Sequence, residues 1–385
     1  MLTVSLFLPF YVSVAAVSAI SIMTVFHFEK RAEAFREPYS KFIIIVLILT
    51  FFVGAVYTNR VGMVYSLLMT AAVISAFYLR SIMTRQLFNN MMDTACLAGT
   101  ACVFVAAAQK LANLGINPGY RPVSTFSNAN YFGMMMEFLM LIAMYRMFTN
   151  SQNKRLYYLA AGASLIGIYL SASVSSAAAL GCGVLVMLFL KGKYRLAGTF
   201  LFLGLTVAAG AVIFPEIFPR VEIIGQSWEQ RFSIWSTAFQ GIERHPLFGE
   251  GPMTYQMIYD KYFGYKTYHS HNLMIDTILN FGFVGAGAIC FYLVTQLKVL
   301  AARFRNNICG NMNILLLSAF ITILVHGMTD VTIFWIQTGM LFLLMYSSTG
   351  IHSSYVSGRV HASRRLPILP DYGESAHAGA VYFKN

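Results

Sequence analysis

Eleven stretches of mostly apolar residues, each about as long as a membrane-spanning helix, constrain this chain more than any other feature. A helix needs about 20 predominantly apolar residues to cross the hydrocarbon core of a bilayer. The runs cover residues 2–28, 41–58, 61–79, 93–111, 131–148, 156–172, 174–190, 196–214, 273–298, 312–331 and 333–350. They predict an all-α, polytopic membrane helix bundle of about 11 transmembrane helices.

The composition favours lipid as the solvent. Of the residues, 57% are hydrophobic and only 11% are charged, whereas a soluble domain carries about a quarter charged residues. The net charge of +12 does not indicate a nucleic-acid partner, because the basic residues form short clusters between apolar runs. The five cysteines show no paired spacing, so neither a disulfide framework nor a cysteine metal site is expected. The N-terminus lacks the features of a cleaved signal peptide and is interpreted as a first membrane helix.

The basic residues predict the orientation of the chain. Nineteen of the 27 Lys and Arg residues fall in one set of alternate connections and in the C-terminal tail. Cytoplasmic loops carry the excess of Lys and Arg, so this set is expected to be cytoplasmic. An odd number of spans then places the N-terminus outside and the C-terminus inside.

One connection on the predicted outer side is much longer than the others. It divides the chain into four predicted parts: transmembrane helices 1–8 (1–214), a large extracytoplasmic loop (215–271), transmembrane helices 9–11 (272–350) and a flexible cytoplasmic tail (351–385). Within the loop, apolar residues recur at helical spacing, namely Trp228, Phe232, Trp235, Phe239 and Ile242. They predict an amphipathic helix that lies on the membrane or on the bundle.

A series of polar motifs follows in the same loop and in the next span. In chain order they are Arg231-Phe232-Ser233-Ile234-Trp235, His245-Pro246-Leu247-Phe248-Gly249-Glu250-Gly251, His269-Ser270-His271-Asn272-Leu273 and Asn280-Phe281-Gly282-Phe283-Val284-Gly285. This order and spacing resemble the O-antigen ligase/polymerase superfamily, best over about 228–290. Weaker similarities are the element from Ser124 to Asn130 and the pair His326 and Asp330.

The resemblance implies a GT-C-like membrane glycosyltransferase. Such enzymes move a glycan from undecaprenyl diphosphate to an acceptor hydroxyl at the outer face of the bacterial cytoplasmic (inner) membrane. The implied partners are the undecaprenyl-diphosphate-linked oligosaccharide, the acceptor glycan and membrane lipid, with no cofactor and no metal. One departure is Ser173-Val174, where the family often has a Ser-Arg pair. If that Arg normally helps to hold the donor diphosphate, another residue must replace it.

Two kinds of side chain are expected to carry the chemistry. A guanidinium is a permanently charged fork suited to the oxygens of a diphosphate leaving group, and Arg231 is the first candidate, with Arg121 second. A hydroxyl nucleophile benefits from a positioned base, and His271 matches the family His, with His269 as a neighbour that could substitute. The structural alternatives are a pairing of Arg231 with Glu229 or Glu243 and a capping role for His271.

The remaining candidates are expected to bind substrate. Asn272 is also a plausible N-cap of the ninth span, and the aromatic stripe with Trp235 is more often packing than glycan stacking. His326 and Asp330 stand where ionisable groups are usually functional, or they join two helices. Glu137 and Asp276 are left unassigned. His269 and His271 form an H-x-H pair, but no third ligand lies nearby in sequence, so no metal site is expected.

Three functions remain open from the sequence. Glycan transfer is favoured, with polymerisation of a surface polysaccharide preferred slightly over ligation to a lipid core, wall polymer or protein. A lipid-linked glycan transporter or flippase should carry repeated halves and ionisable groups near the bilayer midplane; no internal repeat is visible, and the charges gather in the outer loop. A structural or sensory membrane protein is the third alternative.

Overall fold

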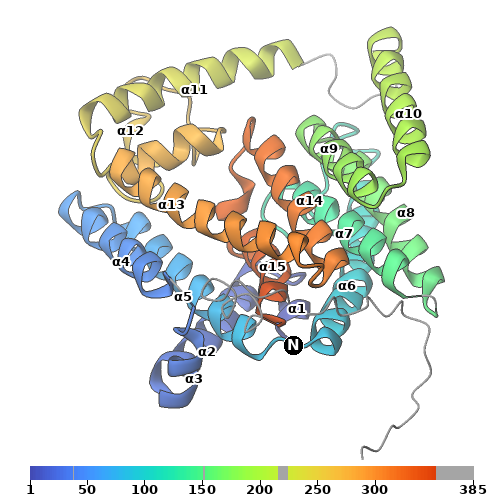
Figure 1. Ribbon diagram of the computed structural model, residues 1–385. Coiled ribbons are helices and arrows are strands. Elements are labelled where there is room, and N and C mark those ends of the chain that lie inside the picture. Colours follow the sequence, from blue (N-terminus) through green and yellow to red (C-terminus); the bar gives the residue numbers. More distant parts are fainter. Residues whose placement is uncertain (38, 151, 216–223, 353–385) are drawn as a thin grey trace, which may run out of the picture.

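The computed structural model describes residues 1–37, 39–150, 152–215 and 224–352, and every regular element in these ranges is a helix (Figure 1). Each of the eleven apolar runs contains a helix, so the all-α prediction is confirmed. The α-helices are α1 (Leu2–Ser5), α2 (Phe10–Phe26), α3 (Phe28–Ala34), α4 (Ser40–Val56), α5 (Arg60–Ile82), α6 (Arg85–Asn113), α7 (Ala129–Thr149), α8 (Lys154–Ser171), α9 (Val174–Leu190), α10 (Tyr194–Ile213), α11 (Ile224–Arg244), α12 (Thr254–Ile258), α13 (Leu273–Arg305), α14 (Gly310–Gly327) and α15 (Ile336–Tyr346). Two 3₁₀ turns, η3 (Thr332–Phe334) and η4 (Ser347–Gly350), flank α15. The predicted tail lies outside the described residues from 353 onwards.

The described helices confirm a multi-pass membrane protein by length and composition. Six of them are long and apolar enough to cross a bilayer: α5, α6, α7, α10, α13 and α14. The pair α2 and α3, bent by 104°, adds a seventh candidate, and α4 and α9 are shorter apolar helices. Three predicted spans are interrupted, one of them the span 273–298, in which α13 is broken at Gly282. Pro9, which has no amide proton, separates α1 from α2, and the run 333–350 contains only the 11-residue helix α15 between its 3₁₀ turns.

Helix α7 is the centre of the bundle. In its membrane-length window 83% of the residues are buried, and α6, α8, α9 and α14 pack around it. Glycines on the neighbours permit the close approach, since a Cβ at Gly167 would lie 2.6 Å from the Met136 side chain. The polar side chains of Asn130 and Glu137 are therefore held on the most enclosed helix of the molecule.

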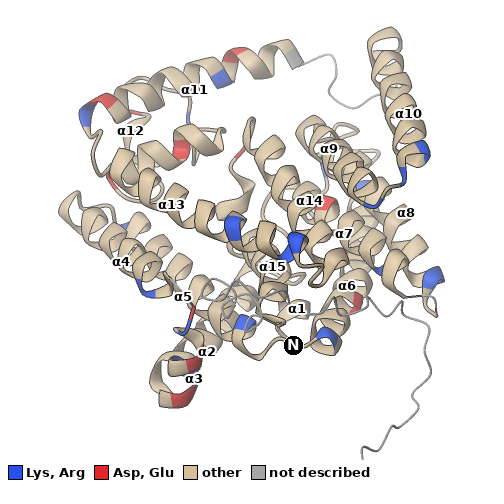
Figure 2. Ribbon diagram, viewed as in Figure 1, with Lys and Arg blue, Asp and Glu red and all other residues tan. Residues whose placement is uncertain are grey.

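Hydrogen bonds and ion pairs tie the connections between helices into two groups. In one group, Asn59 bonds to Pro252, Thr125 to Phe7, Arg121 to Ser171 and Thr329 to Ser175. Apart from Phe7 and Thr329, which lie in predicted spans, these residues belong to or flank connections predicted to be outer. In the other group, Arg80 bonds to Glu37 and Thr349, Arg303 to Ile351 and Lys191 to Asn311. Apart from Thr349, which lies in the last predicted span, these residues belong to segments predicted to be cytoplasmic. Most of the ribbon carries no charge (Figure 2).

The helix predicted in the large loop is present as α11, which lies across one end of the molecule (Figure 1). Its buried face is formed by Ile234, Ala238 and Ile242, packed against α12 and α13. Of the predicted stripe, only Ile242 belongs to the buried face and Trp235 packs against it, whereas Trp228, Phe232 and Phe239 are exposed.

The glycine motifs interlock two segments that are distant in sequence. Helix α13 is broken at Gly282, whose φ of 62° and ψ of −178° are not helical. The freed amides of Phe283 and Val284 donate to the carbonyls of Pro246 (2.7 Å) and Leu247 (3.0 Å). A Cβ at Gly282 would overlap the backbone of Leu247. The turn after α11 thus fits into the break in α13.

This interlock predicts different effects for two glycines of α13. Gly282→Ala should destabilise the protein by at least about 1–3 kcal/mol, because an L-residue is strained at this φ and ψ and its Cβ meets backbone. At Gly287 a Cβ would have nothing within 4 Å, so Gly287→Ala should be neutral or stabilising by about 0.5–1 kcal/mol. Thermal unfolding in detergent measures both. Equal Tm values for the two variants would contradict the interlock.

Candidate active site

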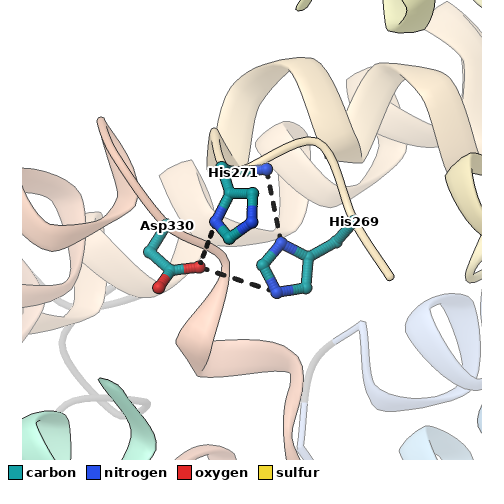
Figure 3. A group of neighbouring side chains, drawn as sticks. All are labelled: His269, His271 and Asp330. Atoms are coloured by element: carbon teal, nitrogen blue, oxygen red, sulfur yellow. Dashed lines mark hydrogen bonds and ion pairs between the residues drawn. The ribbon is translucent and has the colours of Figure 1, made fainter. Parts of the chain in front are cut away.

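Asp330, just beyond the end of α14, is the centre of a cluster of predicted site residues (Figure 3). Its Oδ1 lies 3.1 Å from Nδ1 of His271 and 3.6 Å from Nε2 of His269. Its Oδ2 accepts a hydrogen bond from the Asn130 amide of α7. The carboxylate is 2% exposed, so three separate segments of the chain meet on one buried acid.

The loop before α13 holds the two imidazoles in place. Asn272 caps the helix, its side-chain oxygen accepting from the amides of Met274 and Ile275, which confirms the predicted N-cap. His271 has a φ of 52°, a left-handed conformation that is uncommon for residues other than glycine and that costs of order 1–3 kcal/mol. The amide of Ser270 donates to Asp276 (2.8 Å). Local strain and capping together turn both rings towards Asp330.

Burial and charge set the protonation of the cluster. Burial lowers the pKa of His269 to about 4, although the Asp330 carboxylate acts in the opposite direction. Burial alone would raise the pKa of Asp330, but the charges of His271, His269 and His326 and a hydrogen bond from His271 hold it well below its usual range. At neutral pH the arrangement is therefore a carboxylate beside a neutral His269.

The hydrogen bonds of His271 assign its tautomer. Because an ionised carboxylate only accepts, Nδ1 of His271 carries the proton that faces Asp330. The lone pair is then on Nε2, which lies 3.1 Å from the Thr267 hydroxyl. The side chain is 25% exposed. His271 thus has the orientation of a general base whose other nitrogen is held by an acid.

Two guanidinium groups reach the same end of the molecule. Arg231, on α11, donates from Nε to the carbonyl of Thr329 (3.2 Å), the residue before Asp330, and stacks over Trp228. Arg121 donates to Asn130 (2.6 Å) and to the carbonyl of Ser171 (2.8 Å). Arg121 therefore lies against the C-terminal end of α8, where the α8–α9 connection begins.

A second acid–histidine pair lies deeper in the bundle. Nδ1 of His326 is 2.7 Å from Oε1 of Glu137, and both side chains are fully buried. The carbonyl of His326 accepts from the amides of Thr329 and Asp330. Glu137 and Asn130 are seven residues apart on α7. Glu137 contacts His326 on α14, and Asn130 contacts Asp330 in the turn that follows α14. His326 therefore supports the backbone of the turn that carries Asp330.

The structure brings together most of the predicted site residues. Arg121, Arg231, His269, His271, Asn272 and Asp330 all contribute to the network around residues 328–330. Trp235 is different, since its described ring contacts are with Trp228 and Phe232 on α11. Sequence reasoning assigned no role to Thr267 or to the carbonyl of Thr329, for which no motif gives a signal. Asn130 was part of a recognised element without an assigned role.

The cluster also supplies the third metal-type ligand that the sequence did not reveal. One ligand atom each from His269, His271 and Asp330 lies within 4.8 Å of the others. Asp330 follows His271 by 59 residues, so no short spacing could have indicated it.

Comparison with known proteins agrees with the motifs. Residues 158–290 match a family model described as O-antigen ligase, which confirms the resemblance predicted from the sequence. The matched region contains Arg231, Trp235, His269, His271 and Asn272, whereas Arg121, His326 and Asp330 lie outside it. No curated protein matches the chain.

Proposed function

We propose that this chain, with its O-antigen ligase region, transfers a glycan from undecaprenyl diphosphate to an acceptor hydroxyl at the outer face of the cytoplasmic membrane. The observation that carries the proposal is the hydrogen bond between Asp330 and Nδ1 of His271, which leaves Nε2 as a base. Two guanidinium groups lie in the same network. A base and a phosphate-binding charge are the two functions that this transfer needs.

His271 acts as the general base. The acceptor hydroxyl gives its proton to Nε2 of His271 as its oxygen bonds to the anomeric carbon of the donor sugar. The bond between that carbon and the diphosphate oxygen breaks, and undecaprenyl diphosphate leaves with the electron pair. Asp330 stabilises the imidazolium and keeps its tautomer, a role worth about 10²–10⁴-fold together with the base.

Arg231 and Arg121 balance the charge that develops on the leaving diphosphate. A bidentate guanidinium is suited to phosphate oxygens and keeps its charge at any physiological pH. Arg231 approaches from α11 and Arg121 from the connection between α6 and α7. With this charge supplied by the protein, the proposed reaction is metal-independent.

The grouping of contacts into two sets supports the proposed topology. Hydrogen bonds tie together the described parts of the connections at 57–60, 112–130, 171–176, 224–271 and 328–333, and the strongly basic set is joined separately. We assign the site end to the extracytoplasmic side, with the N-terminus outside, the C-terminus cytoplasmic and eleven spans. The large loop then forms a cap over helices 1–8 and 9–11.

Between the two forms of transfer, we favour polymerisation over ligation. The basis is the absence of the family's Arg at Val174. Glycan from a deletion strain separates them. Single repeats on the final acceptor indicate lost polymerisation, and long chains that remain on undecaprenyl diphosphate indicate lost ligation.

Cell-free transfer tests the function directly. Purified protein in detergent should convert an undecaprenyl-diphosphate-linked oligosaccharide, which a transporter would not do without a membrane compartment. Arg231→Ala should lower kcat/KM for the donor by about 10²–10³-fold, as expected for loss of a group that stabilises transition-state charge. Arg231→Lys should recover only part of this, because an ammonium lacks the planar fork.

Arg244→Ala is the matched control, since Arg244 is an exposed residue in the last turn of the same helix. It should transfer at the wild-type rate. Equal rates for the Arg231 and Arg244 variants would remove Arg231 from the site.

A further inference from the structure

We propose that His269, His271 and Asp330 form a binding site for a divalent cation of the zinc class, and that a bound ion silences the base. The second part rests on the proposed function, whereas the first does not. The bound ion would inhibit the enzyme and not serve catalysis. Nδ1 of His271 cannot bind the ion and at the same time donate its hydrogen bond to Asp330.

The distances suit a small cation. In a tetrahedral zinc site with bonds of about 2.0–2.2 Å, neighbouring ligand atoms are separated by about 3.3–3.6 Å. Asp330 Oδ1 is 3.1 Å from Nδ1 of His271 and 3.6 Å from Nε2 of His269. All three ligand atoms lie within 4.8 Å of one another (Figure 3). Small ring rotations would bring them to bonding distance of one ion.

The ligand set and its supports also favour zinc. Two imidazoles and one carboxylate are typical zinc donors, whereas magnesium and calcium prefer oxygen ligands. Asn130 donates to Oδ2 of Asp330 and leaves Oδ1 directed at the two rings. Such an outer hydrogen bond commonly orients a metal-binding carboxylate. The capped loop at Asn272 fixes the two histidines in advance.

Binding would change the tautomer of His271. Without an ion, Nδ1 carries the proton and Nε2 the lone pair. An ion on Nδ1 takes the lone pair there, so the ring proton moves to Nε2, which can then no longer accept a proton from an acceptor hydroxyl. Zinc and the acid–base pair therefore exclude each other.

His269 limits the affinity. Its Nδ1 accepts a hydrogen bond of 3.3 Å from the amide of His271, so its proton is on Nε2 in the ion-free state. To bind an ion through Nε2, His269 must change tautomer and lose this long hydrogen bond. The site should accordingly be reversible and open to removal by a chelator.

Binding is tested on the full chain, purified through a tag without histidines. Co²⁺ absorption and calorimetric titration with Zn²⁺ should show one ion per chain. Asp330→Asn and His269→Gln should each weaken binding at least about tenfold, within the range for loss of a ligand or its support. His245→Gln is the control, because His245 pairs with Glu250 outside the cluster, and it should bind as the wild type does. Equal affinity in the wild type and Asp330→Asn would overturn the site.

Inhibition is tested in the transfer assay. Zn²⁺ should stop transfer by the wild type, a chelator should restore it, and Mg²⁺ should have no effect. In His269→Gln, the Zn²⁺ concentration for half-inhibition should rise at least about tenfold, relative to that variant's own zinc-free rate. Full activity with the site saturated, or an enzyme that needs zinc after chelation, would overturn the exclusion. If no preparation transfers glycan, the proposed function fails while the binding titrations still decide the site.

Discussion

Replacing His271 with Ala is expected to lower the rate of glycan transfer by about 10²–10⁴-fold, the usual contribution of a positioned general base. Without Nε2 of His271, no nitrogen is in place to accept the proton of the acceptor hydroxyl. Asp330→Asn should approach the same loss, because an amide neither holds the Nδ1 proton in the same way nor stabilises an imidazolium. Single-turnover transfer with excess enzyme measures the chemical step in both variants.

His245→Gln serves as the matched control. His245 also pairs with a carboxylate, Glu250 at 3.1 Å, and it lies at the same end of the molecule. Transfer within a few-fold of wild type is expected for this variant. If His271→Ala transfers at the wild-type rate while remaining inserted and abundant, His271 is not the base.

The second large effect is on stability and concerns the buried pair of Glu137 and His326. Glu137→Leu should destabilise the protein by about 3–5 kcal/mol, because it leaves His326 fully buried without its partner. His326→Leu should destabilise the protein by a similar amount, because it leaves the Glu137 carboxyl group buried without its partner. The double variant with Leu at both positions should recover much of the loss, since well-packed apolar residues often replace a buried pair at little cost.

Thermal unfolding of the four proteins in one detergent makes a double-mutant cycle. Additive losses in the double variant would show that the two side chains do not act as a pair. Transfer by the double variant gives a second readout. A stable protein with reduced transfer would indicate that the pair also sets the position of Asp330, through the amides that donate to the His326 carbonyl.

Local patterns predicted the helices and one of the caps well. Each of the eleven apolar runs contains a helix, because lipid and the bundle interior both favour continuous apolar surface. Asn272 was predicted as an N-cap from its position before a run, and its side chain makes the capping bonds. The break at Gly282 was not predicted. Its cause is the pair of backbone hydrogen bonds to Pro246 and Leu247, which belong to a different element, the turn after α11. A local sequence pattern cannot reveal such a contact.

The site itself was predicted as a set of residues and not as a network. His271 and Arg231 were selected by motif, but their meeting at residues 329–330 depends on how α11, α13 and α14 pack. The same is true of Glu137, which sequence reasoning left unassigned and which the structure pairs with His326. His326 was expected to bind substrate, yet its side chain is fully buried. We therefore propose that it supports the turn that carries Asp330.

The interlock between the turn after α11 and the break in α13 restricts how substrates enter. If the large loop opened as a hinged lid, the amides of Phe283 and Val284 would lose their hydrogen bonds to the carbonyls of residues 246 and 247. This opening would also break the bonds from Asn59 to the carbonyls of Glu250 and Pro252. A backbone amide without a hydrogen-bond partner in an apolar environment costs several kcal/mol. The middle of the loop is thus fixed in place, and the donor of the proposed reaction would have to enter without lifting it.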